Sequence, residues 1–599
     1  MLFPKMQETS RYRNMTTVFG GYNRQLSLSE GEFFDMQNMT SKYFPILSPR
    51  QNRGIIKTFT NPQGILDKED LWWVDDRTLY RNGEAIELNG VYMNHSKSKV
   101  LAKMGAYIII MPDKIWCKVN EKNNRIECGY MDNAFTITSG EEISFSICDS
   151  YGKSIEWRYS EYYQTNEAKD GDYAMSVSAE GKPSLKVYSA STGIWMTVAS
   201  PYVQITFPGI GIGFEKEDGI KITTDYIGDE LDTIFVNDEG DGLYSINTYI
   251  IDRTDDSITI PGIYNGRITP FTEMLLKIER NVPDMSFVTE CNNRLWGCSE
   301  DGHEIYCSKL GDVKNWNCFR GVSTDSWAAT IGSDGKFTGA ITYLGYPIFF
   351  KEDSLVKISV SAVGGHQIKE TMCRGVQNGS ERSLAILNEI LYYKSPNGIV
   401  CYNGSLPYSI SDAFGDVNYY DAVAGVIGDK YYVSMRDSEG IYSMFVYDSK
   451  NKIWCKEDDA NAISFCRHNN ELYYIDANDN TMKSVGGTLI YDYPEKATED
   501  KFDWFVESGP IGYSSPDNKY VGRISLRITL EFGTDVDFYL QYDSCGEWEH
   551  MFNMSGSGTR SYSIPIIPRR CDHFRYKIKG KGLCKIHSIT KTIEEGSDI

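Results

Sequence analysis

The stretch EILYYKSPNGIVCYNG, residues 389–404, contains the pattern on which the fold prediction rests. An apolar and aromatic run is followed by a polar turn with the pair Asn397-Gly398, and then by a second apolar run. Asn-Gly pairs supply the positive φ that tight hairpin turns need, and the flanking residue types favour half-buried strands. The stretch therefore predicts a β-hairpin.

The same pattern recurs along the chain, for example in DLWWVDDRTLYRNG (70–83), AYIIIMPDKIWCKVN (106–120) and YPIFFKEDSLVKIS (346–359). Between Phe287 and Val485 the copies begin roughly 40 to 50 residues apart, which is the length of one four-stranded blade. Such sheets cannot bury both faces alone, so we predict an all-β protein with a β-propeller of about five to eight blades. Residues 422–485 are the clearest predicted blade. A β-sandwich built from the same hairpins is the alternative.

Changes in this pattern divide the chain into modules. The hairpin repeat lapses between about residues 130 and 280, where other strand-like runs predict a β-rich domain inserted into a propeller loop. PFTEMLLKIER (270–280) is the best candidate for a helix. Clean alternation after about residue 496 predicts a compact antiparallel β-sandwich. The predicted organisation is an extended arm (1–54), the propeller (55–129 and 281–495), the insertion (130–280) and the C-terminal sandwich (496–599).

The arm contains VFGGYNRQLSLSEGEFFDMQNMTSKYFPILSPRQNRG, residues 18–54. Gly20-Gly21 predicts a sharp turn, and Pro45 and Pro49 stiffen the extended backbone. We expect the arm to pack on the rim of the propeller or on a neighbouring subunit.

Composition excludes several classes of function. The 599 residues carry a net charge of −21, which argues against wrapping nucleic acid through neutralised phosphates. The charge is compatible with a channel through which DNA slides without sticking. Fourteen scattered cysteines without zinc-ligand spacing predict reduced thiols and folding in a reducing cytoplasm. The beginning, MLFPKMQETSRYR, does not resemble a signal peptide, and the longest apolar run, YIIIM (107–111), is too short to span a bilayer.

Motifs that carry chemistry are weak in this sequence. GIGIGFEKEDG (209–219) resembles a phosphate-binding loop but lacks the final glycine and the following helix. The seven histidines are dispersed, no GxSxG occurs, and SDGKF (333–337) is only a fragment of a sialidase turn. The acidic runs DDRT, KEDD and TEDKFD are as typical of surface turns as of catalytic pairs. We therefore predict no enzyme activity, no catalytic residue, no cofactor and no metal site.

One basic cluster stands out, PRRCDHFRYKIKGKG (568–582). Alternation places Phe574, Tyr576 and Ile578 on one strand face and the charges on the other, so a solvated face is the simplest interpretation. Among functional roles, docking of a neighbouring subunit is favoured over nucleic-acid binding.

Both ends of the chain resemble a family of tailed-bacteriophage virion proteins, the packaged-DNA stabilisation or tail-nozzle β-propeller proteins. The resemblance rests on FGGYN, GEFFDMQNMT and YFPILSPRQNRG in the arm and on IPIIPRRCDHFRYKIKGKGLCKIHSITKTIEEGSD at the end, while residues 130–280 match no family. It implies a homo-oligomeric ring, six-fold in symmetry, in the tail of a virion assembled in the host cytoplasm. The implied partners are portal, adaptor or other tail proteins and DNA that passes through the lumen, with no membrane.

This resemblance, together with the arm and the basic cluster, gives a set of candidate subunit-contact residues: Phe19, Tyr22, Phe33, Phe34, Tyr43, Phe44, Arg569, Arg570 and Arg575. The alternative function is a receptor- or glycan-binding tail protein, with or without glycosidase activity, in which Trp72, Trp73, Trp116 and Trp454 would stack on sugar rings. A scaffold of the kelch type is a third possibility, supported by the blades alone.

Overall fold

The structure is a computed structural model of the chain. It describes residues 11–95, 99–120, 125–159, 167–179, 181–226, 231, 234–266, 270–272, 274–360, 365–489, 497–512 and 518–595. The first ten residues of the predicted arm lie outside these ranges.

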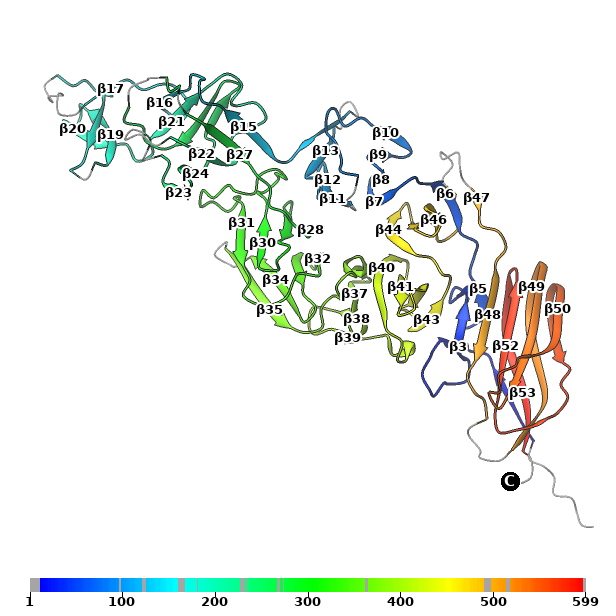
Figure 1. The fold of residues 1–599 in the computed structure, drawn as a ribbon. Helices are drawn as coiled ribbons and strands as arrows, with labels where there is room; N and C mark the ends of the chain where they lie inside the picture. The colour runs from blue at the N-terminus through cyan, green and yellow to red at the C-terminus, as the bar shows by residue number, and fades with distance from the viewer. Residues whose placement is uncertain are drawn as a thin grey trace, which may run out of the picture.

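Seven sheets of the described chain form a β-propeller, six with four strands and one with five (Figure 1). Two blades precede the insertion: β7 (Pro62–Lys68), β8 (Asp70–Asp75), β9 (Thr78–Arg81) and β10 (Glu84–Ile86), then β11 (Val100–Met104), β12 (Tyr107–Met111), β13 (Ile115–Val119) and β14 (Ile126–Tyr130). The third and fourth blades are β28 (Phe287–Glu290), β29 (Leu295–Cys298), β30 (Glu304–Cys307) and β31 (Trp327–Thr330), then β32 (Gly339–Tyr343), β33 (Tyr346–Phe350), β34 (Ser354–Val360) and β35 (His366–Met372). The fifth and sixth are β36 (Ala385–Leu387), β37 (Ile390–Ser395), β38 (Gly398–Tyr402) and β39 (Tyr408–Ser409), then β40 (Tyr419–Ile427), β41 (Lys430–Asp437), β42 (Tyr442–Asp448) and β43 (Ile453–Lys456).

The seventh blade is completed by a strand from the beginning of the chain. It pairs β44 (Ala462–His468), β45 (Glu471–Asp476) and β46 (Thr481–Ser484) with β6 (Gly54–Thr58), and β47 (Ala497–Thr498) adds to the outer edge of β6. The innermost strands β44, β7, β11, β28 and β32 contact one another in succession. The short 3-10 helix η2 (Glu381–Ser383) bridges β32 and β40, and β40 contacts both β36 and β44. The circle of blades is therefore closed.

The central strands of the blades read as apolar runs because adjacent blades cover both of their faces. Every residue of β45 is buried, as are Leu71 to Asp75 in β8. The quoted hairpin is present, but its two-residue loop consists of Pro396 and Asn397, since Ser395 pairs with Gly398. Gly398 has a φ of 128° and a Cβ there would lie 2.2 Å from the Ser411 hydroxyl, so glycine is needed at this position.

Residues 422–485, predicted as one blade, belong to two. SMFVYDSKNKIWCKE contains the last two strands of the sixth blade, and ISFCRH is the first strand of the seventh. The prediction placed these strands in one sheet because the polar loop 457–461 between the blades is as short as a hairpin turn within a blade.

The insertion folds into three further sheets around its own core. The first contains β15 (Asn133–Ile137), β22 (Gly219–Thr224), β23 (Asn237–Gly240), β24 (Leu243–Tyr249) and β27 (Leu276–Arg280). The second contains β16 (Ser144–Cys148), β21 (Tyr202–Thr206), β25 (Asp252–Thr254) and β26 (Ser257–Pro261), and the third β17 (Trp157–Tyr159), β18 (Tyr173–Val177), β19 (Pro183–Ser189) and β20 (Ile194–Thr197). The entering strand β15 pairs with the leaving strand β27, so the domain is attached through two adjacent strands.

The helix predicted within residues 270–280 is wrong. Leu276–Arg280 is a strand between β15 and β22, and its burial alternates with period two, with Leu276, Ile278 and Arg280 inside. Pairing with two neighbours outweighs the helix propensity of this Leu- and Glu-containing segment.

The C-terminal module is one curled, mixed sheet of nine strands. It contains β48 (Asp503–Ser508), β49 (Lys519–Tyr542), β50 (Glu549–Ile564), β51 (Arg570–Cys571), β52 (Phe574–Lys581) and β53 (Cys584–Glu595). The long strand β49 pairs with β53 along its first half and with β52 along its second half. One core contains buried residues of both halves, so the curled sheet encloses that core as the two layers of a sandwich would.

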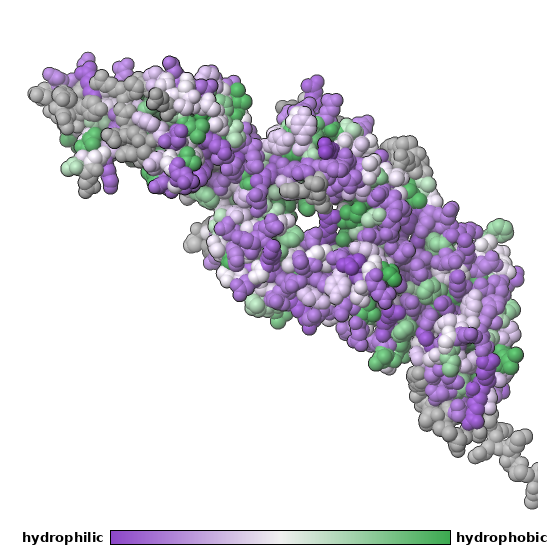
Figure 2. All heavy atoms as spheres, in the orientation of Figure 1, coloured by the Kyte–Doolittle hydropathy of each residue, from purple (hydrophilic) through white to green (hydrophobic). Residues whose placement is uncertain are grey.

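The predicted arm is part of this sheet rather than a separate extended segment. β1 (Arg11–Thr16) pairs with β53, and β3 (Glu32–Gln37) pairs with β48 and, in parallel, with β2 (Gly21–Tyr22). β4 (Met39–Thr40) and β5 (Ser48–Pro49) form a separate two-stranded sheet. The molecule is elongated, with the insertion at one end, the propeller in the middle and the C-terminal sheet at the other end (Figure 1). The visible face is mainly hydrophilic, with hydrophobic residues in small scattered groups (Figure 2).

Candidate functional site

The chain enters and leaves the propeller at one place, where residues 50–55 and 497–499 lie side by side. Ala497 pairs with Ile55, and the backbone N–H of Arg53 donates to the Glu499 carboxylate at 3.0 Å. The Arg50 guanidinium donates two hydrogen bonds to the same carboxylate, at 2.7 and 2.9 Å. These two connecting segments, 50–55 and 497–499, are thus bound to each other.

Arg53 attaches both connecting segments to the propeller. Its Nη2 lies 2.5 Å from Glu457 Oε2 and 2.9 Å from Asp458 Oδ2, and its Nη1 donates to the Val485 carbonyl at 3.0 Å. The side chains of Arg53, Glu457 and Asp458 are 3%, 2% and 9% exposed, so water does not screen these charges. We call Arg50, Arg53, Glu457, Asp458 and Glu499 the entry clamp.

Charge pairing offsets the burial of Asp458 in the entry clamp. Burial acts to raise the pKa of Asp458, but Arg53 and Arg50 hold that pKa below its ordinary value. A buried ion pair of this kind is costly to break, because removal of one partner leaves an uncompensated charge in the interior. The clamp therefore fixes the C-terminal sheet to the propeller.

A second charged joint attaches the insertion to the third blade. Glu215 forms an ion pair with Lys314 at 2.5 Å, and Glu217 pairs with both Lys309 and Arg320. The contact with Lys309 is the main cause that lowers the pKa of Glu217. We call the loop 213–219 together with Lys309, Lys314, Asn315 and Arg320 the insertion clamp.

Backbone contacts make the insertion clamp tight. The Gly219 N–H donates to Asn315 Oδ1 at 3.1 Å, and Asn315 Nδ2 donates to the Glu217 carbonyl at 2.6 Å. A Cβ on Gly219 would lie 2.2 Å from the carbonyl carbon of Asn317. Inside the insertion, the buried Arg280 and Asp218 pair at 2.5 Å. The motif GIGIGFEKEDG, which resembles a phosphate loop, thus has its acidic residues engaged with cations of the same chain.

The predicted subunit-contact residues of the arm divide into two groups. Phe19, Tyr22 and Phe33 are buried within the chain's own core, where Tyr22 packs on Phe414 and Phe445 of the propeller. Their burial within one chain removes these three side chains from the surface. The contact of Tyr22 with the propeller matches the other expectation for the arm. Phe34 and Phe44 are half-buried and Tyr43 is 38% exposed, with Lys585 Nζ over its ring at 4.1 Å.

Two of the three predicted basic contact residues lie at the surface. Arg569 and Arg570 are exposed, and Arg569 pairs with Glu549 at 2.6 Å. Arg575 is half-buried, pairs with Glu507 and donates to the Ser508 carbonyl at 3.2 Å. Phe574, Tyr576 and Ile578 face the core, as the alternation predicts, so the charged side chains form the solvent-facing side of β52.

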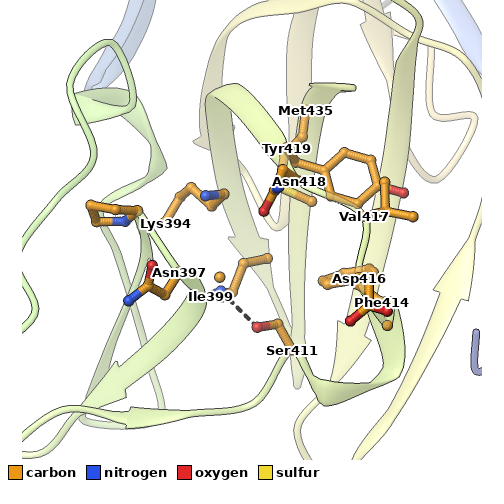
Figure 3. A pocket seen from close by; sticks show the side chains of 13 residues that line it. Lys394, Asn397, Ile399, Ser411, Phe414, Asp416, Val417, Asn418, Tyr419 and Met435 are labelled. Atoms are coloured by element: carbon orange, nitrogen blue, oxygen red, sulfur yellow. Dashed lines mark hydrogen bonds between the residues drawn. The ribbon is translucent and has the colours of Figure 1, made fainter. Parts of the chain in front are cut away.

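One pocket lies between the fifth and sixth blades (Figure 3) and has a volume of about 350 Å³. Its floor includes Lys394, Ser411 and Tyr419, and its rim includes the exposed Asn397 and Asp416. Lys394 Nζ donates to the Ser395 carbonyl at 2.6 Å, and burial lowers the pKa of this amine to about 8.

Three of the four tryptophans proposed for sugar stacking belong to the interior. Trp72 and Trp73 are fully buried and Trp454 is 3% exposed. Trp116 is half-buried and contacts Tyr107 edge-on. The described residues contain no group of three or more His, Cys, Asp or Glu that could hold a metal ion. Within the same residues, no helix has the length and apolarity needed to cross a bilayer.

Charge is distributed unevenly among the modules. The insertion, residues 130–280, contains 25 Asp and Glu against 11 Lys and Arg, a net charge of −14. The C-terminal residues 496–599 contain 15 acidic and 14 basic residues, a net charge of −1. The two ends of the elongated molecule therefore differ strongly in charge.

No family model matches this chain, and no curated protein matches it. Among solved structures, an exo-β-1,3-galactanase from Phanerochaete chrysosporium bound to galactose is similar at 8% identity and a TM-score of 0.21, covering 50% of this chain and 92% of that chain. Hsv2 from Kluyvelomyces marxianus is similar at 9% identity and a TM-score of 0.22, covering 39% of this chain and 69% of that chain. At these TM-scores the likeness carries no argument about activity or partners.

Proposed function

We propose that this chain is a structural subunit of a tailed-bacteriophage virion, a ring-forming tail-nozzle or head-to-tail channel component that lines or closes the DNA exit path. The observation that carries the proposal is the pair of clamps, which join three β modules into one stiff, elongated body. A ring that holds packaged DNA under load needs subunits of this kind, because a flexible joint would let the circle deform. The family resemblance of the two chain ends points to the same role.

The charge distribution supports a DNA channel. A lumen lined by the acidic insertion would repel the phosphate backbone and let DNA pass without capture. The more neutral C-terminal sheet, with Arg569 and Arg570 exposed, would meet neighbouring copies or the portal and adaptor proteins without that repulsion. In this arrangement the insertion points inward, and the virion tail is assembled in the host cytoplasm as a homo-oligomeric, six-fold ring.

The alternative of a glycan-binding tail protein has no specific observation in its favour. Its four candidate tryptophans lie in or beside the core. This alternative remains a prediction, and binding to or hydrolysis of bacterial surface polysaccharide would support it.

Mass photometry of the purified chain, alone and with its portal and adaptor proteins, tests the proposal. We expect one discrete oligomer, six copies in a closed ring. A chain that stays monomeric with those proteins, or that hydrolyses or is retained on bacterial surface polysaccharide, would contradict it.

A further inference from the structure

Two of the fourteen cysteines face each other across neighbouring strands. Cys117 in β13 is the direct antiparallel partner of Cys128 in β14, at the outer edge of the second blade. Directly opposite residues place their side chains on the same face of a sheet. None of the other strand registers in the described chain pairs two cysteines; Cys298, for example, faces Ile305, and Cys307 faces Trp296.

The hydrogen-bond pattern shows which kind of pair this is. At one end of the ladder the Met131 N–H donates to the Lys114 carbonyl at 2.7 Å, and at the other end the Asn120 N–H donates to the Arg125 carbonyl at 2.8 Å. Hydrogen-bonded and non-hydrogen-bonded pairs alternate along an antiparallel ladder. The end pairs Lys114/Met131 and Asn120/Arg125 are hydrogen-bonded, and the pair Cys117/Cys128 lies three positions from each of them. Because the two pair types alternate, Cys117 and Cys128 form a non-hydrogen-bonded pair.

This position has the geometry that a disulfide requires. Cα atoms of non-hydrogen-bonded pairs lie about 4.5 Å apart, and their side chains are closer than in the other pair type. Disulfides span Cα distances of about 4.4–6.8 Å, so the strands need no rearrangement. The two side chains already interact, and Cys117 is the main cause that lowers the pKa of Cys128.

We propose that Cys117 and Cys128 are a disulfide site, reduced while the chain folds and oxidised once the protein meets a small-molecule disulfide in an oxidising medium. Cys128 is half-buried and Cys117 is fully buried, so Cys128 reacts first. Its thiolate attacks one sulfur of the small disulfide, which releases one small thiol and leaves a mixed disulfide. The Cys117 thiolate then attacks the Cys128 sulfur and releases the second small thiol, so two protein thiols are oxidised and one disulfide is reduced to two thiols.

The bond would act on the path that leads to the insertion. β14 is the edge strand of its blade, and it runs through Met131 and Asp132 into β15, the first strand of the insertion. A covalent link to β13 would hold this edge strand in place and restrict the unfolded chain. The inference rests on the strand register and is independent of the proposed function.

The test uses the full chain purified with reductant, then treated with oxidised glutathione and digested without reduction. Trypsin should yield Ile115–Lys118 linked to Ile126–Lys153. Because the second peptide also contains Cys148, the Cys148→Ser variant should give the same link. The exposed Cys545 should be glutathionylated in the same sample, which shows that the oxidant is active. Cys298 and Cys307 lie on adjacent strands but are not opposite each other, so they should stay thiols.

Two results separate the proposal from chance oxidation. The wild-type chain should show a higher Tm after oxidation, and Cys128→Ser should show neither the link nor this shift. If Cys117 and Cys128 stay free thiols while Cys545 is modified, or if the link forms only in denaturant, the proposal is wrong.

Discussion

Arg53 and Asp458 form a buried ion pair, with 2.9 Å between Nη2 and Oδ2. The pair joins the residue just before β6, the strand that closes the propeller, to the loop between the sixth and seventh blades. The two residues are 405 positions apart in the sequence, so the contact forms only when both ends of the propeller have met. The pair thus couples closure of the circle to attachment of the C-terminal sheet.

We expect Arg53→Met to lower the free energy of unfolding by about 3–5 kcal/mol, because Glu457 and Asp458 are left charged and buried. Denaturant unfolding monitored by tryptophan fluorescence measures this change. Arg436→Met is the matched control, since Arg436 pairs with Asp421 at the surface and its loss should leave stability unchanged. Equal effects of the two variants would contradict the role given to the entry clamp.

Gly219→Ala should loosen the insertion from the third blade. The added Cβ would overlap the backbone of Asn317, and overpacking of this kind costs about 1–3 kcal/mol. Hydrogen exchange should increase in residues 213–219 and 309–320. Gly332→Ala, where a Cβ would meet nothing within 4 Å, is the control and should leave exchange unchanged.

Ile56→Ala tests the strand that closes the propeller. Ile56 in β6 is fully buried in the core shared with the first and seventh blades, so the cavity should destabilise the protein by about 2–5 kcal/mol. Ile441→Ala, at a side chain that is 56% exposed, should have little effect in the same thermal unfolding assay.

Lys394→Met should stabilise the protein at neutral pH. Burial lowers the pKa of Lys394 from 10.5 to about 8, which corresponds to a cost of about 3 kcal/mol for keeping the amine charged in the fold. Between these two pKa values the unfolded chain binds more protons at this site, so the cost is complete below pH 8 and fades as the pH rises toward 10.5. The advantage of the variant over wild type should therefore shrink between pH 8 and 10.5 in denaturant titrations.

Lys483→Met is the control for this prediction. Lys483 pairs with the buried Asp476 at 2.8 Å, and its loss leaves that carboxylate without its cation. This variant should destabilise the protein at neutral pH. A stabilising Lys483→Met, or a destabilising Lys394→Met, would contradict the electrostatic explanation.

Local patterns predicted much of the fold. The hairpins around 70–83, 106–120 and 389–404 are present, the propeller closes with seven blades in the described chain, and the strands of residues 130–280 form their own sheets. These features depend on alternation and turn residues, which are properties of neighbouring positions. The blade boundary at residues 457–461 was missed because a loop between blades and a turn within a blade have the same composition.

Contacts between distant residues could not be predicted in this way. Nothing in GIIKT (54–58) indicates that it completes a blade made by residues 462–484. The pairing of β1 and β3 with the C-terminal strands cannot be predicted from local patterns either, because the sequence of an edge strand does not specify which strand it pairs with. Arg50, Arg53 and Asp218 could be recognised only after the structure was known, as charged residues in segments that are buried.

Cryo-electron microscopy of the assembled protein tests the central claim most directly, since it shows the number of copies, the orientation of the insertion and the charge that lines the lumen. The account predicts a closed ring in which each copy keeps the three-module shape and the insertion faces an acidic channel wide enough for duplex DNA. Particles that are single molecules, or rings whose lumen is lined by the basic residues of β52, would contradict it.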